Sequence, residues 1–96
     1  MKLKIYSIRD SKAEIFNTPF YQKTHGEAER NFRSLVNDDK SQVNKYPEDY
    51  ALWYLGEYDD NTGSFSTLDQ PQHILNAVQV IMPKNQASGS QLTNIN

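Results

Sequence analysis

The sequence contains no cysteine, so it can form neither a disulfide nor a thiolate site, which fits a protein of a reducing cytoplasm. It also contains no apolar run near the roughly 18 residues that a membrane span needs. The first ten residues, MKLKIYSIRD, alternate in polarity and lack the apolar centre and small-residue cleavage site of a signal peptide. These absences predict a protein that does not contact a membrane.

Sequence motifs of catalysis are missing as well. The two histidines, His25 and His73, are far apart and have no metal-ligand spacing around them. The serines lie outside any G-x-S-x-G elbow, and no glycine-rich phosphate loop is present. The run Asp59-Asp60-Asn61 lacks the rest of a calcium loop and is typical of a turn. We therefore predict that the protein is not an enzyme and holds no metal or cofactor.

A strong positive charge is also lacking, because the net charge is −2. Residues 1–45 hold nine Lys/Arg against six Asp/Glu, or +3, whereas residues 46–96 hold one against six, or −5. Proteins that bind duplex DNA mainly through its phosphates are usually strongly basic. Any nucleic-acid binding by this chain must use a local surface in its first half, or contact bases more than the backbone.

What the sequence does contain is a readable order of elements. Alternating polarity in residues 2–8 predicts a half-buried strand. A capping-box spacing followed by apolar residues at helical intervals predicts an amphipathic helix over residues 24–37. Residues 50–58 predict an aromatic strand, and the turn-forming residues 59–63 predict a hairpin into a further strand at about residues 64–68.

Other segments are less well defined. Residues 10–18 are expected to end in an extended conformation, because a proline follows them. Residues 40–49 are expected to be a polar loop, and residues 72–82 either a short helix or an edge strand. Residues 84–96 are polar with almost no apolar content, which predicts a disordered tail. Residues 1–83 would then form a single domain.

Together these elements predict an α+β fold. It consists of a small three-stranded, mainly antiparallel sheet in β-α-β-β order, with one amphipathic helix packed on one face and a short C-terminal element. The strand residues expected beneath the helix are Leu3, Ile5, Ala51, Trp53 and Leu55. The uncovered face is expected to carry Lys2, Lys4, Tyr6, Tyr50 and Tyr54.

The uncovered face is the first candidate for nucleic-acid binding. Aromatic rings stack on the bases of single strands, beside cations that follow the backbone, and each stacked base contributes about 1–3 kcal/mol. Arg9, Arg30 and Arg33 form a second, basic candidate. The tyrosines are more simply explained as cover for the sheet, as contacts to a final helix or as a dimer interface, and the arginines as a solvated helix face.

Several short motifs occur in one order along about residues 2–68. They are Ser7-Ile8-Arg9-Asp10, Lys12-Ala13, Thr18-Pro19-Phe20, Leu35-Val36-Asn37-Asp38, Pro47-Glu48-Asp49-Tyr50, Gly56, and Asp59-Asp60 with Thr62-Gly63. In this set and order the chain resembles the small non-structural protein of gokushoviruses, the tailless single-stranded-DNA phages of the Microviridae.

The resemblance implies a DNA-binding protein that is made in the cytoplasm of the infected bacterium and is absent from the virion. Its implied role is the synthesis or packaging of single-stranded viral DNA, and no binding residue is carried over with it. The expected partners are single-stranded DNA, phage or host replication and packaging proteins, and a second copy of the chain. The alternative is a protein–protein adaptor or dimerisation module that recruits replication proteins without touching DNA.

Overall fold

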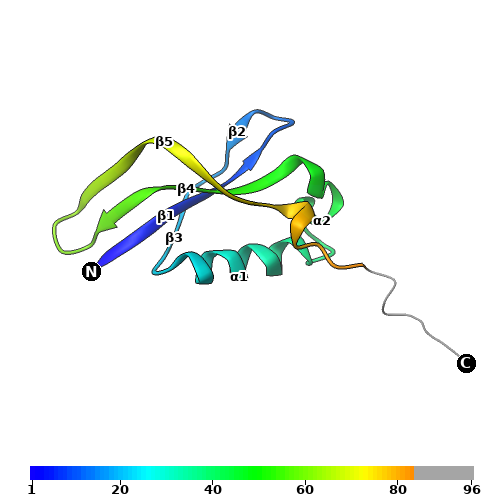
Figure 1. Cartoon of the computed structure of the whole chain (residues 1–96), viewed down its shortest axis with the longest axis horizontal. Coiled ribbons are helices and arrows are strands. Elements are labelled where there is room, and N and C mark those ends of the chain that lie inside the picture. Colours follow the sequence, from blue (N-terminus) through cyan, green and yellow to red (C-terminus); the bar gives the residue numbers. More distant parts are fainter. Residues whose placement is uncertain (84–96) are drawn as a thin grey trace, which may run out of the picture.

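The structure, a computed structural model, describes residues 1–83, and the expected disordered tail lies outside them. Its elements are β1 (Lys2–Asp10), β2 (Ile15–Phe16), β3 (Phe20–Gln22), α1 (His25–Val36), α2 (Gln42–Lys45), the 3-10 turn η1 (Pro47–Asp49), β4 (Tyr50–Asp59), β5 (Ser64–Asn76) and the 3-10 turn η2 (Ala77–Gln79). Figure 1 shows the one main helix, α1, beneath a strongly curved antiparallel sheet. The predicted α+β class is confirmed.

The sheet has more strands than the three that were predicted. Its order is β2-β1-β4-β5, all neighbours are antiparallel, and β3 also pairs with β1. The link between β2 and β3 stays on the edge of β1, because the Asn17 N–H donates to the Ile8 carbonyl (2.9 Å) and Ser7 Oγ donates to the Asn17 carbonyl (2.6 Å). β2 lies in the segment that was predicted only to end in an extended conformation, and β3 was not predicted; together they add one further edge to the sheet.

Helix α1 forms where its capping residues predict it. Thr24 Oγ1 accepts from the Glu27 N–H (3.1 Å), and Glu27 Oε1 accepts from the Lys23 N–H (3.2 Å). The helix ends at the C-cap Asn37, also as predicted, and its buried residues are Ala28, Phe32 and Val36. Within residues 1–83, no helix has the length and apolar character needed to cross a membrane.

The segment expected to be a polar loop, residues 40–49, instead contains α2 and η1. Ser41 Oγ starts α2 by accepting from the Asn44 N–H (3.0 Å) and also donates to the Leu35 carbonyl at the end of α1 (2.7 Å). Val43 is buried there. One buried apolar residue and one capping side chain support this short helix. The polar composition of the segment gave no sign of it.

The ambiguous residues 72–82 form the end of β5, then η2, then a short segment held against α1. The Asn37 side-chain amide donates to the carbonyls of Arg33 (2.9 Å) and Val80 (3.1 Å). Asn37 Oδ1 accepts from the Met82 N–H (2.7 Å). One side chain therefore caps the helix and fixes the last described residues beside it.

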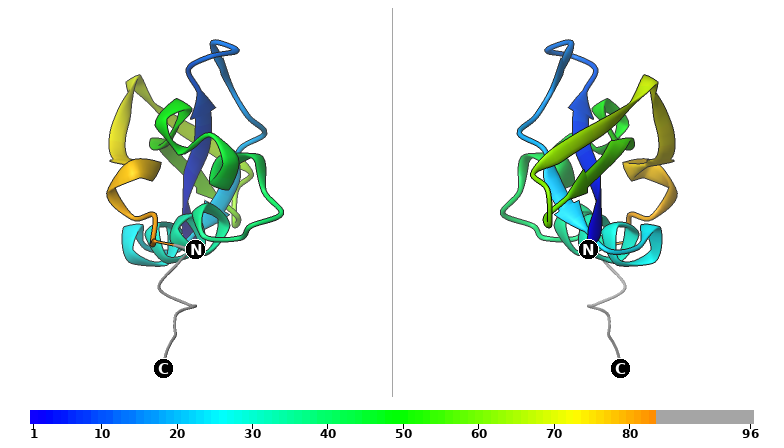
Figure 2. Two further views of the ribbon diagram at one scale, coloured as in Figure 1. Left: turned by 90° about the vertical axis from the view of Figure 1, so that its right-hand side faces the viewer. Right: turned by 90° about the vertical axis from the view of Figure 1, so that its left-hand side faces the viewer.

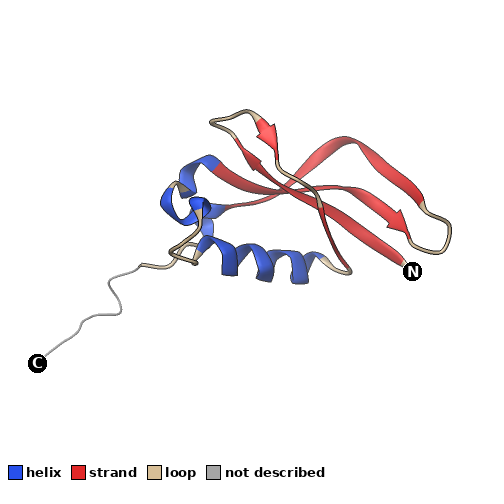
Figure 3. Ribbon diagram, turned by 180° about the vertical axis from the view of Figure 1, so that it is seen from behind, coloured by secondary structure: helices blue, strands red, loops and turns tan. Residues whose placement is uncertain are grey.

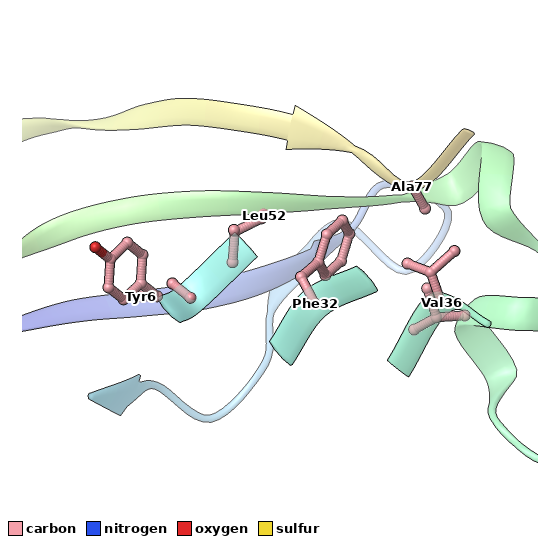
Figure 4. Packing of buried hydrophobic residues seen from close by; sticks show 7 residues of the cluster. Tyr6, Phe32, Val36, Leu52 and Ala77 are labelled. Carbon is pink, nitrogen blue, oxygen red and sulfur yellow. The ribbon is translucent and has the colours of Figure 1, made fainter. Parts of the chain in front are cut away.

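The hydrophobic core lies between α1 and one face of the sheet (Figure 4). Its fully buried members include Tyr6 of β1, Leu52 of β4, Phe32 and Val36 of α1, and Ala77. Partly buried residues such as Ile8, Phe20 and Tyr54 pack around them.

The predicted assignment of the two sheet faces is wrong. The strand register places Lys2, Lys4, Tyr6, Tyr50 and Tyr54 on one face, as expected, but this is the face that α1 approaches, and Trp53 lies on the other. Alternation separates strand residues into two sets without saying which set is covered. Tyr6 enters the core because its hydroxyl finds a partner there, Nδ1 of His25.

A β-bulge at Leu55 shifts the alternation of side chains between the two faces of β4. Ile5 pairs with Gly56 and Tyr6 with Tyr54, so Leu55 is an extra residue in β4. Without it, residues separated by five positions, such as Trp53 and Tyr58, would point to opposite faces. With it, both lie on the face away from α1.

The sheet curls into a half-barrel that is open on the side away from α1. Figure 2 shows the β1–β2 hairpin and β5 rising on that side, and Figure 3, seen from behind, shows β5 arching away from α1. β5 arches strongly, because residues 68–71 lie between its pairs Thr67–Gly56 and Gln72–Tyr54 and oppose only Leu55. We call the resulting concave face the trough.

Candidate nucleic-acid interface

The trough carries aromatic side chains at its two ends. At one end, the Trp53 cluster consists of Phe16, Trp53 and His73, from β2, β4 and β5. The Phe16 and Trp53 ring centroids are 5.7 Å apart at 82°, and those of Trp53 and His73 are 5.3 Å apart at 81°. These edge-to-face contacts follow from the strand register, in which Trp53 pairs with His73 and Phe16 lies on the neighbouring edge of β1.

At the other end, the Tyr58 cluster consists of Tyr21, Tyr58 and Phe65, from β3, β4 and β5. The Tyr21 and Tyr58 centroids are 5.8 Å apart at 61°, and those of Tyr58 and Phe65 are 4.9 Å apart at 39°. Tyr58 and Phe65 are direct cross-strand partners. Both clusters therefore use one ring from β4 and one from each side of the sheet.

These rings are accessible from solvent. Phe16 and Tyr21 are each 41% exposed and Phe65 is 60% exposed, while Trp53 and Tyr58 are half-buried beneath them. An exposed aromatic face is costly in water, because it leaves apolar area unburied. The arrangement offers flat surfaces on which another planar group can stack.

Arg9 is the charged residue that β1 and β4 present to the trough. Its guanidinium carbon lies 5.3 Å from the Phe16 ring centroid. The register puts the other charged residues of these two strands on the opposite face; they are Lys2, Lys4, Asp10, Glu57 and Asp59. Within residues 1–83 Arg9 forms no ion pair, so its charge remains available to an anion.

A hollow of about 170 Å³ lies beside the Trp53 cluster. Its polar lining includes Arg9, Glu48, Asp49 and Asn76. Asn76 Oδ1 lies 2.7 Å from His73 Nε2, which holds the imidazole at the edge of the hollow. This end of the trough combines an indole face with hydrogen-bond donors and acceptors.

The other predicted site residues do not lie in the trough. Lys4 Nζ is 3.6 Å from Glu57 Oε2 and 5.8 Å from the Tyr54 ring centroid, on the helix side of the sheet. Arg30 and Arg33 are exposed on α1. Of the predicted set, the structure brings only Arg9 to the open aromatic face, and nucleic-acid binding by the rest stays a prediction.

The fold raises the pKa of the hydroxyl group in two of the predicted tyrosines. Burial raises the pKa of Tyr6 from 10.0 to about 12, with further contributions from Tyr54, Glu29 and Glu27. Burial and the neighbouring Asp10 also raise the pKa of Tyr50. Both hydroxyls therefore stay neutral at physiological pH.

Sequence reasoning missed five of the six rings in the trough and assigned the sixth, Trp53, to the core. The five are Phe16, Tyr21, Tyr58, Phe65 and His73. The pattern of polar and apolar residues in β4 gives no sign of the bulge at Leu55, which moves the following side chains to the opposite faces. The proline between β2 and β3 hides the fact that both segments are strands. The aromatic content of β4 was the available sign that a ring surface existed.

The described residues also lack a cluster of metal ligands. Among residues 1–83, no three His, Cys, Asp or Glu side chains gather closely enough to hold a metal ion. The absence of a metal or cofactor stays a prediction from the sequence.

Comparison with known proteins gives a family and a relative. The family model described as "Phage ORF5 protein" matches residues 3–80. Protein ORF5 of Chlamydia phage 1 is 35% identical over 74 residues, which cover 72% of this chain and 76% of that protein. No solved structure matches the chain. Neither name states what these proteins bind.

Proposed function

Because this chain belongs to the Phage ORF5 protein family, we propose that it is a phage protein that binds single-stranded DNA in the trough, without catalysis. Its role would be in the synthesis or packaging of viral single-stranded DNA. It would act in the cytoplasm of the host bacterium and outside the virion.

The single observation that carries this proposal is the pair of solvent-accessible aromatic clusters on one concave face. Proteins that bind single strands without sequence preference stack successive bases on such rings. Stacking contributes about 1–3 kcal/mol per base, enough to bind DNA where phosphate contacts are few. This mode suits a chain with a net charge of −2.

The trough favours single strands over duplex DNA for a chemical reason. Bases in a duplex already stack on their neighbours, and their faces are not free to meet protein rings. Duplex binding relies on phosphate neutralisation by many cations, whereas β1 and β4 bring only Arg9 to this face. The protein is expected to select the unpaired form.

The proposal is tested by titrating a fluorescently labelled single-stranded oligonucleotide at about 50 mM salt, where phosphate contacts are strong. The double variant Phe16→Ala/Phe65→Ala removes one exposed ring from each cluster and is expected to weaken binding at least tenfold, or about 1.4 kcal/mol. Tyr46→Ala, at an equally exposed tyrosine outside the trough, serves as the matched control.

A second control addresses the surface predicted from sequence. The variant Lys2→Ala/Lys4→Ala changes the helix side of the sheet and is expected to bind like the parent. Loss of binding in this variant, with the ring variant unaffected, would move the site to that face. No binding by the parent at about 50 mM salt would refute direct DNA binding.

The alternative, a protein–protein adaptor, has one specific observation in its favour. Phe65 and Leu68 are 60% and 38% exposed on β5, a strand at the edge of the sheet. The same titration separates the two functions, because an adaptor would show no affinity for the oligonucleotide.

A further inference from the structure

The two aromatic clusters are separated along the trough. Trp53 and Tyr58 are five residues apart on β4. Because Leu55 is an extra residue, their partners Ser7 and Leu3 are only four residues apart on β1, and at about 3.4 Å of rise per residue the two backbones are about 14 Å apart. A single planar group cannot contact both clusters.

The floor between the clusters offers no ring. On this face, between the two clusters, the register places Ile5 opposite Gly56. Ile5 is buried, and Gly56 has no side chain. A ligand that crosses the floor therefore meets small or covered groups between two aromatic ends.

Resting on the proposed DNA binding, we propose that the Trp53 cluster and the Tyr58 cluster are two separate base-stacking subsites for one single strand that runs along β4. Nucleotides stacked at about 3.4 Å cover about 14 Å in about four steps, and an extended strand needs fewer. Full affinity then requires about three to five nucleotides, so a hexanucleotide is long enough to reach both subsites. Bases between the two ends contribute little.

This arrangement predicts a distinct dependence on oligonucleotide length. A dinucleotide occupies one subsite, whereas a hexanucleotide occupies both, and its second contact is intramolecular. Overlapping registers alone give a hexanucleotide a roughly fivefold statistical advantage. We expect an affinity gain at least about tenfold beyond that factor.

The protein carries its own probe for one subsite, because Trp53 is its single tryptophan. A base stacked on the indole changes the tryptophan fluorescence, so dithymidylate and hexathymidylate can be titrated without a label. Two further hexanucleotides sharpen the test. One lacks its four central bases and keeps one base at each end, and the other keeps two bases at one end only.

The expected results follow from the two subsites. The hexanucleotide with a base at each end should bind within about threefold of hexathymidylate, and the one with bases at one end should bind tenfold or more weakly than it. The variant Tyr21→Ala/Phe65→Ala should lower the affinity for hexathymidylate to the level of the one-ended ligand. It should leave dithymidylate binding unchanged.

Both substituted residues are exposed, and the milder variant Tyr21→Leu/Phe65→Leu keeps the apolar contacts of the sheet, so a folding defect can be separated from a binding defect. Circular dichroism of each variant provides the check on folding.

Several outcomes would overturn the inference while leaving DNA binding intact. The first is an affinity gain from dithymidylate to hexathymidylate no larger than the statistical factor. The second is that Tyr21→Ala/Phe65→Ala weakens the binding of both ligands equally. The third is that anisotropy detects binding while Trp53 fluorescence does not change. Absence of all binding would instead remove the proposed function together with this inference.

Discussion

The Tyr6 hydroxyl and Nδ1 of His25 form a hydrogen bond that joins the centre of β1 to the first turn of α1. The Tyr6 side chain is completely buried, and its ring also contacts Phe20 and Tyr54, with centroids 5.8 Å and 5.5 Å away. A phenol in this position must keep its proton, because a phenolate would be desolvated near Glu27 and Glu29.

Alkaline pH is therefore expected to destabilise the protein. Tyr6 has a pKa of about 12 when folded, against 10.0 for an ordinary tyrosine, so the folded state holds this proton more tightly than the unfolded chain. The stabilisation is complete below pH 10 and is lost as the pH rises to 12. The loss is about 2–3 kcal/mol, at about 1.36 kcal/mol per pKa unit. Urea unfolding at a series of pH values measures it.

The variant Tyr6→Phe isolates this contribution. It removes the hydroxyl, so its stability should fall by about 1–2 kcal/mol at neutral pH, because His25 loses its partner. Its stability should then decline less between pH 10 and 12 than that of the parent, with Tyr50 accounting for part of the remaining slope. Parallel pH profiles for parent and variant would contradict the assignment to Tyr6.

Gly56 is expected to tolerate no side chain. Its φ is +150°, and a Cβ built there would lie 2.5 Å from the Ser66 carbonyl oxygen and 2.6 Å from Thr67 Cα. Because both obstacles are backbone atoms, Gly56→Ala should separate β4 from β5 and cost about 2–4 kcal/mol. Gly63→Ala is the control, since its Cβ would meet open space and only its φ of +75° opposes it, at about 1–2 kcal/mol. Equal losses in urea unfolding would show that the close approach is unimportant.

Asn37 is expected to hold residues 80–82 against the helix. Asn37→Ala removes two donated hydrogen bonds and one accepted bond, and should cost about 2 kcal/mol. Hydrogen exchange at the Met82 amide should then accelerate. Asn37→Asp retains an acceptor for that amide and should protect it better than Asn37→Ala. Unchanged exchange in both variants would mean that the Asn37 contact does not hold this segment.

DNA binding in the trough is expected to depend weakly on salt. Each neutralised phosphate contributes a slope of about −0.7 to the plot of log affinity against log salt for single strands. With Arg9 as the cation that β1 and β4 present there, the slope should be about −0.7. Arg9→Gln should bring it closer to zero while retaining most of the stacking affinity. A parent slope steeper than about −3 would point to a different, more basic surface.

Local signals predicted the parts of the fold that depend on neighbouring residues. The cap at Thr24, the spacing of Ala28, Phe32 and Val36, and the C-cap at Asn37 define α1 within a few positions of the chain. The residues from Asp59 to Gly63 likewise close the hairpin, with the Gly63 N–H donating to the Asp59 carbonyl (2.8 Å). These elements were predictable because their determining contacts are short in sequence.

Contacts between distant residues decided the candidate site. Phe16, Trp53 and His73 meet only because β2 and β5 reach the central strands from opposite sides, and the interruption between β2 and β3 conceals the first of these approaches. Arg9 was named from the sequence because of its charge. Its neighbour Phe16 was not named, because the contact between them depends on the unpredicted strand β2.

The amino-acid sequence is sufficient to identify the family, the amphipathic helix, the hairpin and the division of β1 residues into two alternating sets. Which of the two sets faces α1 depends on the packing of the folded chain, because burial of Tyr6 depends on a hydrogen bond to His25, 19 residues away. The bulge at Leu55 then placed Trp53 and Tyr58 on the same open face. Alternation along an unbroken strand determines only which side chains share a face. A bulge changes that division, and a packing partner from elsewhere in the chain decides which face is buried.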